Sequence, residues 1–272
     1  MAAAGATTGG RHKVKLLYFN LRARGEPLRM LLMYSGLEWE DAIVSMDEWR
    51  GGGYKEKMPP GRTGSKQLPV LEFPDCSLMP ESLDIAKWIA QQCSKTNPSS
   101  SLMPETPEMN AKAERLFLLS DDHENPHGGF GKANPLLNWF SVQESSEQLP
   151  AFFEKLPTIL AHLASELGSG PYFCGGSSPT YVDFWIFHYL DNICTLDGGF
   201  SLGRVAAAAG AGGDGLAGFC ERMKGLDAVK RRLAERPQCG THSVGNPGSI
   251  IHSIGNPPEE VFAIKRIIAS SQ

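Results

Sequence analysis

One stretch, residues 67–89, restricts the fold of this chain more than any other. Two short apolar runs, 70–73 and 77–79, flank a Pro-Asp turn, and this pattern is typical of a β-hairpin. Apolar side chains then recur at helical spacing, at Leu83, Ala86, Ile89 and Ala90. The sequence therefore predicts a hairpin that leads directly into a helix.

The ends of this hairpin-helix unit carry groups that suit a small ligand. Pro69 cannot donate to a strand ladder, and a fixed cis turn there would leave the backbone of Leu68 free for a ligand. Ser82 is predicted at the helix N-cap, where its hydroxyl can accept a hydrogen bond from a backbone N–H. The positive end of a helix dipole also suits a carboxylate. Together these residues predict a cradle for a small, anionic, peptide-like molecule.

A β-α-β segment is predicted before the hairpin. The apolar run 13–20 predicts a buried strand, a Glu-Pro pair marks a helix start, and β-branched residues indicate a second strand at 39–44. This order favours two parallel strands joined by a right-handed crossover. A short irregular helix, broken by Gly51 to Gly53, is expected within 46–58. The first domain should therefore have the order β-α-β-α-β-β-α.

The strand signal largely stops after a linker at 96–107 that is rich in Ser, Pro, Asn and Thr. Helical patterns follow at 108–124, 149–167, 180–196 and 216–236. The segment 180–196 is apolar nearly all round, which predicts the central helix of an all-α domain. It begins Thr180-Tyr181-Val182-Asp183, which has the form of a capping box, so a structural role is expected for Asp183. Glycine-rich segments at 125–134 and 203–215 predict loops.

The chain is thus predicted to be α/β plus all-α, in five segments. These are a disordered lead-in at 1–11, an α/β domain at 12–95, the linker at 96–107, an all-helical domain at 108–240 and a tail at 241–272. The tail repeats a similar hexapeptide, His242–Pro247 and His252–Pro257. We interpret the repeat either as a duplication without activity or as a metal-binding or docking segment that uses its paired histidines.

Composition and charge argue against several classes of protein. The formal net charge of −4 gives no electrostatic reason to expect nucleic acid or an anionic membrane as partner. No apolar run approaches the roughly 18 residues of a membrane span. The six cysteines are scattered without a CxxC pair, so zinc or dithiol redox chemistry is not expected. We expect a reduced, cytoplasmic protein without a metal site.

Four segments, in this order and at these spacings, resemble cytosolic glutathione transferases over roughly residues 13–238. They are Leu17-Tyr18-Phe19-Asn20-Leu21-Arg22-Ala23-Arg24-Gly25-Glu26-Pro27, Gln67-Leu68-Pro69-Val70-Leu71, Glu81-Ser82-Leu83-Asp84-Ile85-Ala86 and Thr180-Tyr181-Val182-Asp183-Phe184. The first is similar to the start of sigma-class members, which include prostaglandin D synthases and lens S-crystallins. The resemblance implies a thioredoxin-like N-terminal domain, an all-helical C-terminal domain, glutathione as co-substrate and a homodimer.

The resemblance also implies roles for individual residues. Tyr18 matches the catalytic tyrosine, and Arg24 matches an arginine near the thiol. The residues that match glutathione contacts are Trp49, Gln67, Leu68, the cis-proline Pro69, Glu81 and Ser82. The lysine that meets the glycyl carboxylate is Lys55 as first choice and Lys57 as second. Asp121 or Asp122, with His123 close by, matches an acidic residue that reaches the site of the partner subunit.

The residues also allow other interpretations. Arg24 could instead form an ion pair with Glu26, Trp49 could be a core aromatic, and Glu81 could be an acid that only favours the helix dipole. A thiol transferase that depends on cysteine is disfavoured, because a tyrosine occupies the first-strand position.

The function predicted from the sequence is transfer of the glutathione thiolate to a small, apolar electrophile. A tyrosine hydroxyl that donates to sulfur favours the ionised thiol, which is the role expected of Tyr18. The acceptor is expected near Phe19, Arg24 and the helix that starts at Glu108. Two alternatives stay open: a glutathione-dependent isomerase of the prostaglandin type, and a non-catalytic, crystallin-like structural protein.

Overall fold

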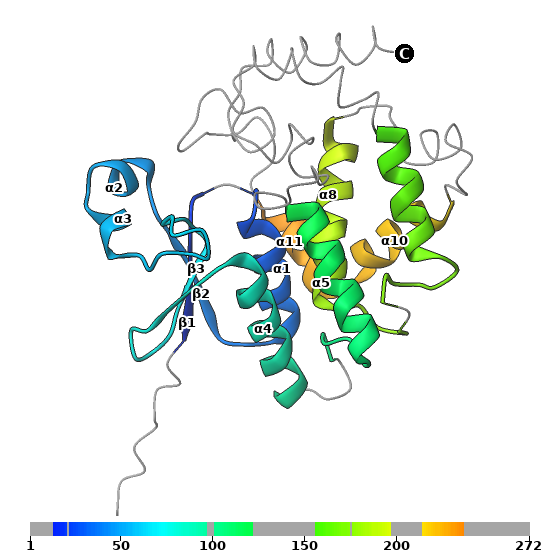
Figure 1. Cartoon of the computed structure of the whole chain (residues 1–272), viewed down its shortest axis with the longest axis horizontal. Helices are drawn as coiled ribbons and strands as arrows, with labels where there is room; N and C mark the ends of the chain where they lie inside the picture. The colour runs from blue at the N-terminus through cyan, green and yellow to red at the C-terminus, as the bar shows by residue number, and fades with distance from the viewer. Residues whose placement is uncertain are drawn as a thin grey trace, which may run out of the picture.

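The computed structural model describes residues 13–20, 22–96, 101–121, 156–174, 176–196 and 214–236 (Figure 1). A four-stranded sheet with two flanking helices is followed by a group of helices, as the sequence predicted. The predicted lead-in, the segments 122–155 and 197–213, and the tail with its histidine repeat lie outside the described residues. Within the described ranges, no helix is both long enough and apolar enough to cross a membrane.

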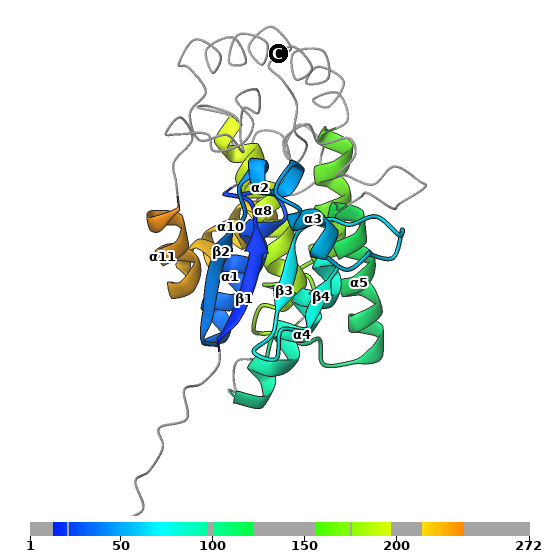
Figure 2. The same ribbon diagram turned by 90° about the vertical axis from the view of Figure 1, so that its left-hand side faces the viewer.

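The strands are β1 (Val14–Tyr18), β2 (Trp39–Ile43), β3 (Val70–Glu72) and β4 (Leu78–Pro80). They lie side by side in the order β2-β1-β3-β4 (Figure 2). β1 and β2 are parallel and are connected through α1 (Gly25–Ser35), whereas β3 pairs antiparallel with both β1 and β4. The predicted β-α-β unit and hairpin are therefore confirmed.

Successive residues of a strand point to opposite faces of the sheet, and β1 and β3 are apolar at successive positions. Both faces of the sheet are therefore apolar and are covered by other elements. Leu16 and Leu71 belong to the large core shared with α1 and with α4 (Ser82–Thr96). Leu17 and Val70 face a smaller cluster on the other side of the sheet. That cluster includes side chains from α2 (Met46–Arg50) and α3 (Tyr54–Lys57), the two short helices that flank the predicted break at the glycines.

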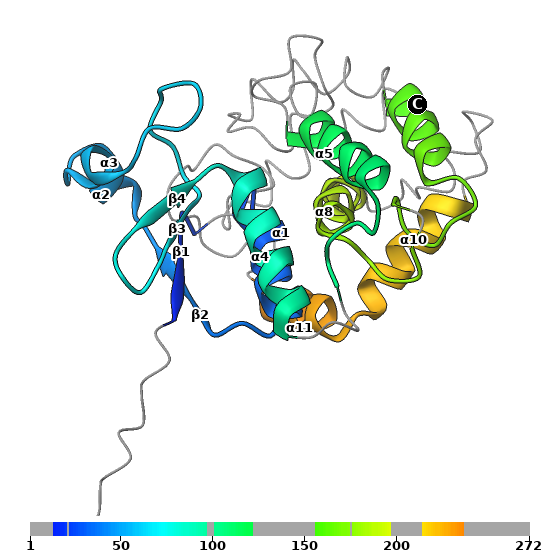
Figure 3. The same ribbon diagram turned by 60° about the horizontal axis from the view of Figure 1, so that its bottom comes forward.

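The C-terminal half is helical in its described parts. It contains α5 (Pro107–Asp121), a helix at 156–167, α8 (Tyr181–Leu196), α10 (Asp214–Gly225) and α11 (Asp227–Glu235). α8 lies among α1, α5 and α10, and its side chains are buried from residue 181 to 191 (Figures 1 and 3). The rings of Phe117 and Trp185 lie 4.1 Å apart in this core. The predicted central helix is confirmed.

The structural role expected of Asp183 is also confirmed. Its carboxylate is fully buried and accepts hydrogen bonds from the backbone nitrogen and the hydroxyl of Thr180, both at 2.7 Å. The other carboxylate oxygen accepts from the backbone nitrogen of Phe173 at 2.9 Å. Burial raises the pKa of Asp183, although these hydrogen bonds favour its ionised form. Asp183 thus fixes the start of α8 and the turn before it.

Candidate active site at the end of the sheet

Tyr18 ends β1 and is almost fully buried, at 3% exposure. Its hydroxyl oxygen accepts a hydrogen bond from the backbone nitrogen of Arg24 at 3.2 Å. Its own carbonyl accepts from the nitrogen of Val44, which extends the pairing with β2. A phenol oxygen that accepts a hydrogen bond also carries its own proton, so the Tyr18 hydroxyl is both an acceptor and a donor group.

The ring of Tyr18 lies against the start of α1. A Cβ atom added to Gly25 would come within 2.3 Å of Cδ1 of Tyr18, so only glycine allows this contact. The guanidinium carbon of Arg29 lies 5.7 Å from the centre of the same ring, within the range of a cation–π interaction. The turn between β1 and α1 therefore holds the Tyr18 side chain from two sides.

Arg24 immediately precedes α1 and is half-buried. Glu26, the ion-pair partner considered for Arg24, accepts two hydrogen bonds from Arg232 instead, at 3.0 and 2.7 Å. No local sequence pattern indicated this contact, because Arg232 lies 206 residues further along the chain.

Aromatic side chains and one lysine meet beside Tyr18. The rings of Tyr18 and Phe19 lie 5.6 Å apart, and Phe19 contacts Trp49 edge-on at 5.8 Å. The Nζ atom of Lys55 lies 5.9 Å from the centre of the Trp49 ring, so α2 and α3 bring these two residues together. Both helices lie over the same end of the sheet as the carboxyl end of β1 (Figure 2).

The peptide bond between Leu68 and Pro69 is cis, in agreement with the sequence prediction. Leu68 is buried, and in the described part of the chain neither its N–H nor its C=O forms a hydrogen bond. Its backbone therefore has unused donor and acceptor capacity. Gln67 is exposed, and its amide nitrogen donates to the hydroxyl of Ser65 at 2.9 Å.

The start of α4 differs by one residue from the prediction. The helix begins at Ser82, and the residue before it is Glu81, whose carbonyl accepts from the nitrogen of Ile85 at 3.0 Å. Glu81, rather than Ser82, is therefore at the N-cap, with a left-handed φ of 73°. Ser82 is buried, and its hydroxyl forms no hydrogen bond with any residue that the structure describes.

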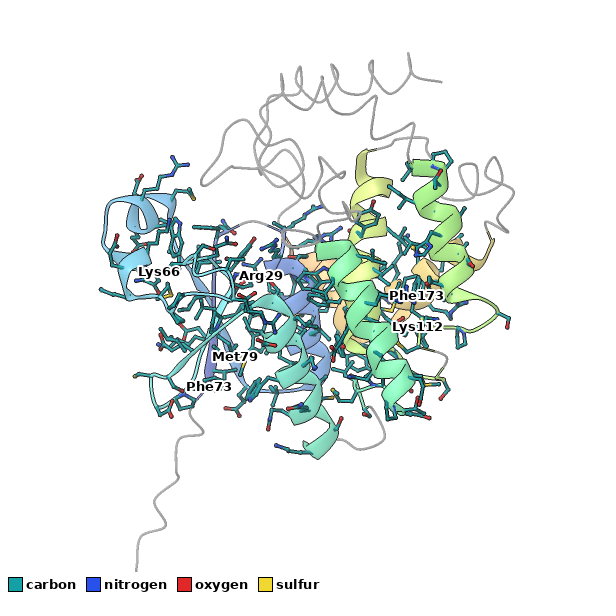
Figure 4. All side chains as sticks on the ribbon, viewed as in Figure 1. Arg29, Lys66, Phe73, Met79, Lys112 and Phe173 are labelled. Carbon is teal, nitrogen blue, oxygen red and sulfur yellow. The ribbon has the colours of Figure 1, made fainter. Side chains whose placement is uncertain are left out.

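A loop was expected at 59–65, but sequence reasoning did not anticipate that residues 61–66 fold back onto the start of α4. Oε1 of Glu81 accepts from the backbone nitrogen of Arg62 at 2.7 Å, and the Arg62 guanidinium pairs with Asp84 at 2.6 Å. Lys66 donates to the carbonyl of Glu56 and lies beside α2 and α3 (Figure 4). The only signal in the sequence was the pair of basic residues between Gly61 and Gln67.

Strand register aligns the central residues of the site. Leu17 lies opposite Val70, and Val70 lies opposite Pro80. Continuing both antiparallel registers by one residue places Tyr18, Pro69 and Glu81 in one row across three neighbouring strands. Neighbouring strands are about 4.8 Å apart, so this row spans about 10 Å. Asp121 is the last residue of α5 that is described, and Asp122 and His123 lie outside the described residues.

Both halves of the chain are similar in sequence to known proteins. The family model "Glutathione S-transferase, C-terminal domain" matches residues 137–238. A glutathione S-transferase of Anopheles gambiae is 38% identical over 179 residues, which cover 65% of this chain and 77% of the relative. The hematopoietic prostaglandin D synthase of Gallus gallus is 30% identical over 175 residues, 63% of this chain and 74% of the relative.

This chain belongs to the glutathione S-transferase family. Its fold is also similar to that of a Caenorhabditis elegans glutathione S-transferase, with a TM-score of 0.63 at 23% identity. That similarity covers 83% of this chain and 99% of the other. The thioredoxin-like N-terminal sheet and the helical C-terminal part are thus those of the family, whose members are enzymes that use glutathione.

Proposed function

We propose that this chain joins the thiolate of glutathione to small, apolar electrophiles, and that Tyr18 activates the thiol. The main support for this proposal is the row across the end of the sheet that contains Tyr18, Pro69 and Glu81. An extended chain covers at most about 3.5 Å per residue, so a tripeptide matches the span of this row. Each part of glutathione then has a nearby group of suitable chemistry.

The γ-glutamyl end of glutathione would bind at the start of α4. The hydroxyl of Ser82 and the first N–H groups of the helix suit its carboxylate, and the positive end of the helix dipole adds to the attraction. Glu81 would attract the ammonium group, because the loop occupies only one of its carboxylate oxygens.

The rest of the peptide would lie across the cis turn and α3. The free N–H and C=O of Leu68 would pair with the cysteinyl backbone, and the adjacent Gln67 is exposed beside it. Lys55, held over Trp49, would meet the glycyl carboxylate. This contact with Trp49 favours Lys55 over Lys57.

Tyr18 would donate its phenol proton in a hydrogen bond to the glutathione sulfur. An ordinary cysteine thiol has a pKa of about 8.5, and only its thiolate is strongly nucleophilic. The hydrogen bond favours the ionised form, so the thiol proton leaves to solvent while Tyr18 keeps its own. The sulfur then attacks the electrophile and forms a C–S bond, and the leaving group departs with its electron pair. Arg24 would add positive charge near the sulfur.

The acceptor would lie near Phe19, Arg24 and α5, between the sheet domain and the helices. We further propose a cytoplasmic homodimer in which Asp121 or Asp122 reaches the site of the partner subunit. The 30% identity to a Gallus gallus prostaglandin D synthase favours a second candidate activity, isomerisation of a prostaglandin-type endoperoxide with glutathione.

Binding and catalysis can be tested with one set of variants. Wild type should be retained on glutathione-agarose and should conjugate chlorodinitrobenzene. Tyr18→Phe should still bind the resin, but its kcat/KM should fall about 100-fold, because it lacks the donor to sulfur. Tyr34→Phe is the matched control, since Tyr34 packs against Phe184 on the other side of α1.

Full activity of Tyr18→Phe would contradict the mechanism, and lack of retention of wild type would favour the structural, crystallin-like alternative. Prostaglandin H2 as substrate separates the two enzymatic candidates. Turnover of prostaglandin H2 far above that of a panel of electrophiles would favour the isomerase.

A further inference from the structure

A buried ion-pair network connects the C-terminal helix α11 to the turn that holds Tyr18. α11 packs against α1 on the far side from the sheet (Figures 1 and 3). Nε and Nη2 of Arg232 both donate to the carboxylate of Glu26, at 3.0 and 2.7 Å. Glu26 is fully buried in the first turn of α1. The two-point geometry fixes the direction of the carboxylate as well as its distance.

Glu26 is the centre of this network. Arg29 and Arg236 each place a guanidinium nitrogen 3.8 Å from its carboxylate, and Arg236 also pairs with Asp191 of α8 at 2.8 Å. Burial alone would raise the pKa of Glu26, but the hydrogen bonds and charge of Arg232, with the charges of Arg29 and Arg236, lower it overall. Glu26 is therefore ionised in the folded protein at neutral pH.

The network reaches Tyr18 by two short routes. One route is Arg29, which donates to the carbonyl of Phe19 at 3.0 Å and to Asp41 at 2.8 Å, and whose guanidinium lies over the Tyr18 ring. The other route is the backbone of the turn. The nitrogen of Glu26 donates to the carbonyl of Arg22 at 2.8 Å, which closes the turn containing the Arg24 N–H and Gly25.

A contribution to stability alone does not account for this arrangement. A buried ion pair is often no more stabilising than apolar residues of similar volume, because both charges lose their hydration. What the bidentate contact supplies is a fixed direction at the residue next to Gly25, against which the Tyr18 ring lies. The position of this ion pair at the turn therefore indicates that it helps to orient the Tyr18 side chain.

We propose that Arg232 is a positioning residue for thiol activation, acting through Glu26 on the turn that holds the Tyr18 hydroxyl. This inference rests on the proposed role of Tyr18. Hydrogen bonds weaken steeply when their geometry changes, so a small shift of the turn would weaken the Tyr18 contact with sulfur. Apart from Tyr18, the residues proposed to bind glutathione lie on α2, α3, the cis turn and α4, so the affinity for glutathione with a protonated thiol should be spared.

The test compares Arg232→Met with Arg231→Met, its neighbour on α11. Arg231 is exposed and pairs only at the surface, with Glu235. Three quantities are measured: the dissociation constant for glutathione, kcat with chlorodinitrobenzene, and the apparent pKa of bound glutathione from its thiolate absorbance. Arg232→Met should raise the apparent thiol pKa by about one unit and lower kcat about tenfold, as expected for a moved donor. Measured below the apparent thiol pKa of wild type, where the bound thiol is protonated, its glutathione affinity should stay within about twofold of wild type. Arg231→Met should match wild type throughout.

A second variant separates positioning from folding. Arg232→Met leaves Glu26 short of a partner, which can unfold the protein. The double variant Glu26→Gln/Arg232→Met removes one negative and one positive charge, so the net charge is unchanged. It should fold with a melting temperature close to wild type and still show the raised thiol pKa and the lower kcat.

A wild-type thiol pKa and kcat in the folded double variant, or in folded Arg232→Met, would overturn the inference. Parallel measurements on Tyr18→Phe keep the two proposals distinct. If Tyr18→Phe loses activity while the Arg232 variants do not, only the positioning role fails. If Tyr18→Phe retains full activity, the proposed function fails as well.

Discussion

The hydroxyl oxygen of Tyr18 lies 3.2 Å from the backbone nitrogen of Arg24, which donates a hydrogen bond to it. Only substitution by proline would remove a backbone donor, so for every other side chain this contact depends on the shape of the turn between β1 and α1. The shape of this turn depends on the absence of a side chain at Gly25, because a Cβ atom there would lie 2.3 Å from the Tyr18 ring.

Gly25→Ala should therefore impair activity more than the addition of a single methyl group would suggest. The methyl group would displace the Tyr18 ring, at a cost in the free energy of unfolding of about 1–3 kcal/mol, which is typical of overpacking. We expect kcat with chlorodinitrobenzene to fall about tenfold or more, as for other small displacements of a reacting group. Gly225→Ala is the control, since a Cβ at that position has no neighbour within 4 Å. Equal kcat values for the two variants would show that the turn tolerates movement.

The contact between Lys55 and Trp49 leads to a second prediction. Lys55→Met should raise the KM for glutathione about tenfold with little change in kcat, because a charge-assisted contact to the glycyl carboxylate is lost. Lys57→Met, two residues away on the same short helix, is the matched control and should leave the KM unchanged. With a glutathione analogue whose glycyl carboxylate is an amide, the difference between Lys55→Met and wild type should largely disappear. A larger effect from Lys57→Met would reassign the lysine.

The order of strands and helices could be predicted because local patterns determine it. β1 and β3 are apolar at successive positions, the hairpin has a Pro-Asp turn, and the glycines at 51–53 separate α2 from α3. The position of Pro69 at the front of a strand predicted a fixed turn, and the family resemblance implied the cis bond that the structure shows. These features each depend on residues close together in the chain.

Features that depend on distant residues could not be predicted. Nothing near Glu26 indicates that its carboxylate is buried, and its partner Arg232 lies in another helix of the other domain. The N-cap of α4 differed from the prediction because Glu81 adopts a left-handed φ, a conformation that no local pattern signalled. The fold of loop 61–66 depends on contacts of Arg62 with Glu81 and Asp84, which lie 19 and 22 residues further along the chain.

Stability should depend on pH through Glu26. Its pKa is lower in the folded protein than in the unfolded chain, so the folded state binds fewer protons in the window between the two values. The stabilisation is present above the unfolded pKa of about 4.3 and is lost as the pH falls toward the folded value. Thermal unfolding of wild type and Glu26→Gln should therefore differ at pH 7, and the difference should shrink as the pH falls below the unfolded pKa of about 4.3 toward the folded value. A difference in melting temperature that stays constant with pH would show that ionised Glu26 contributes nothing.

Asp183 should matter for folding and not for chemistry. Asp183→Ala leaves the nitrogens of Phe173 and Thr180 and the hydroxyl of Thr180 without their acceptor. Each unsatisfied buried donor costs about 1–3 kcal/mol, so we expect at least about 3 kcal/mol of destabilisation in urea unfolding. Asp227→Ala is the control, since Asp227 is an exposed acid in the first turn of α11 and its loss should cost less than about 1 kcal/mol.

In conditions where Asp183→Ala is folded, its kcat should equal that of wild type, because Asp183 lies at the start of α8 and contacts none of the proposed site residues. A lower kcat in fully folded Asp183→Ala would instead show that the start of α8 influences the end of the sheet.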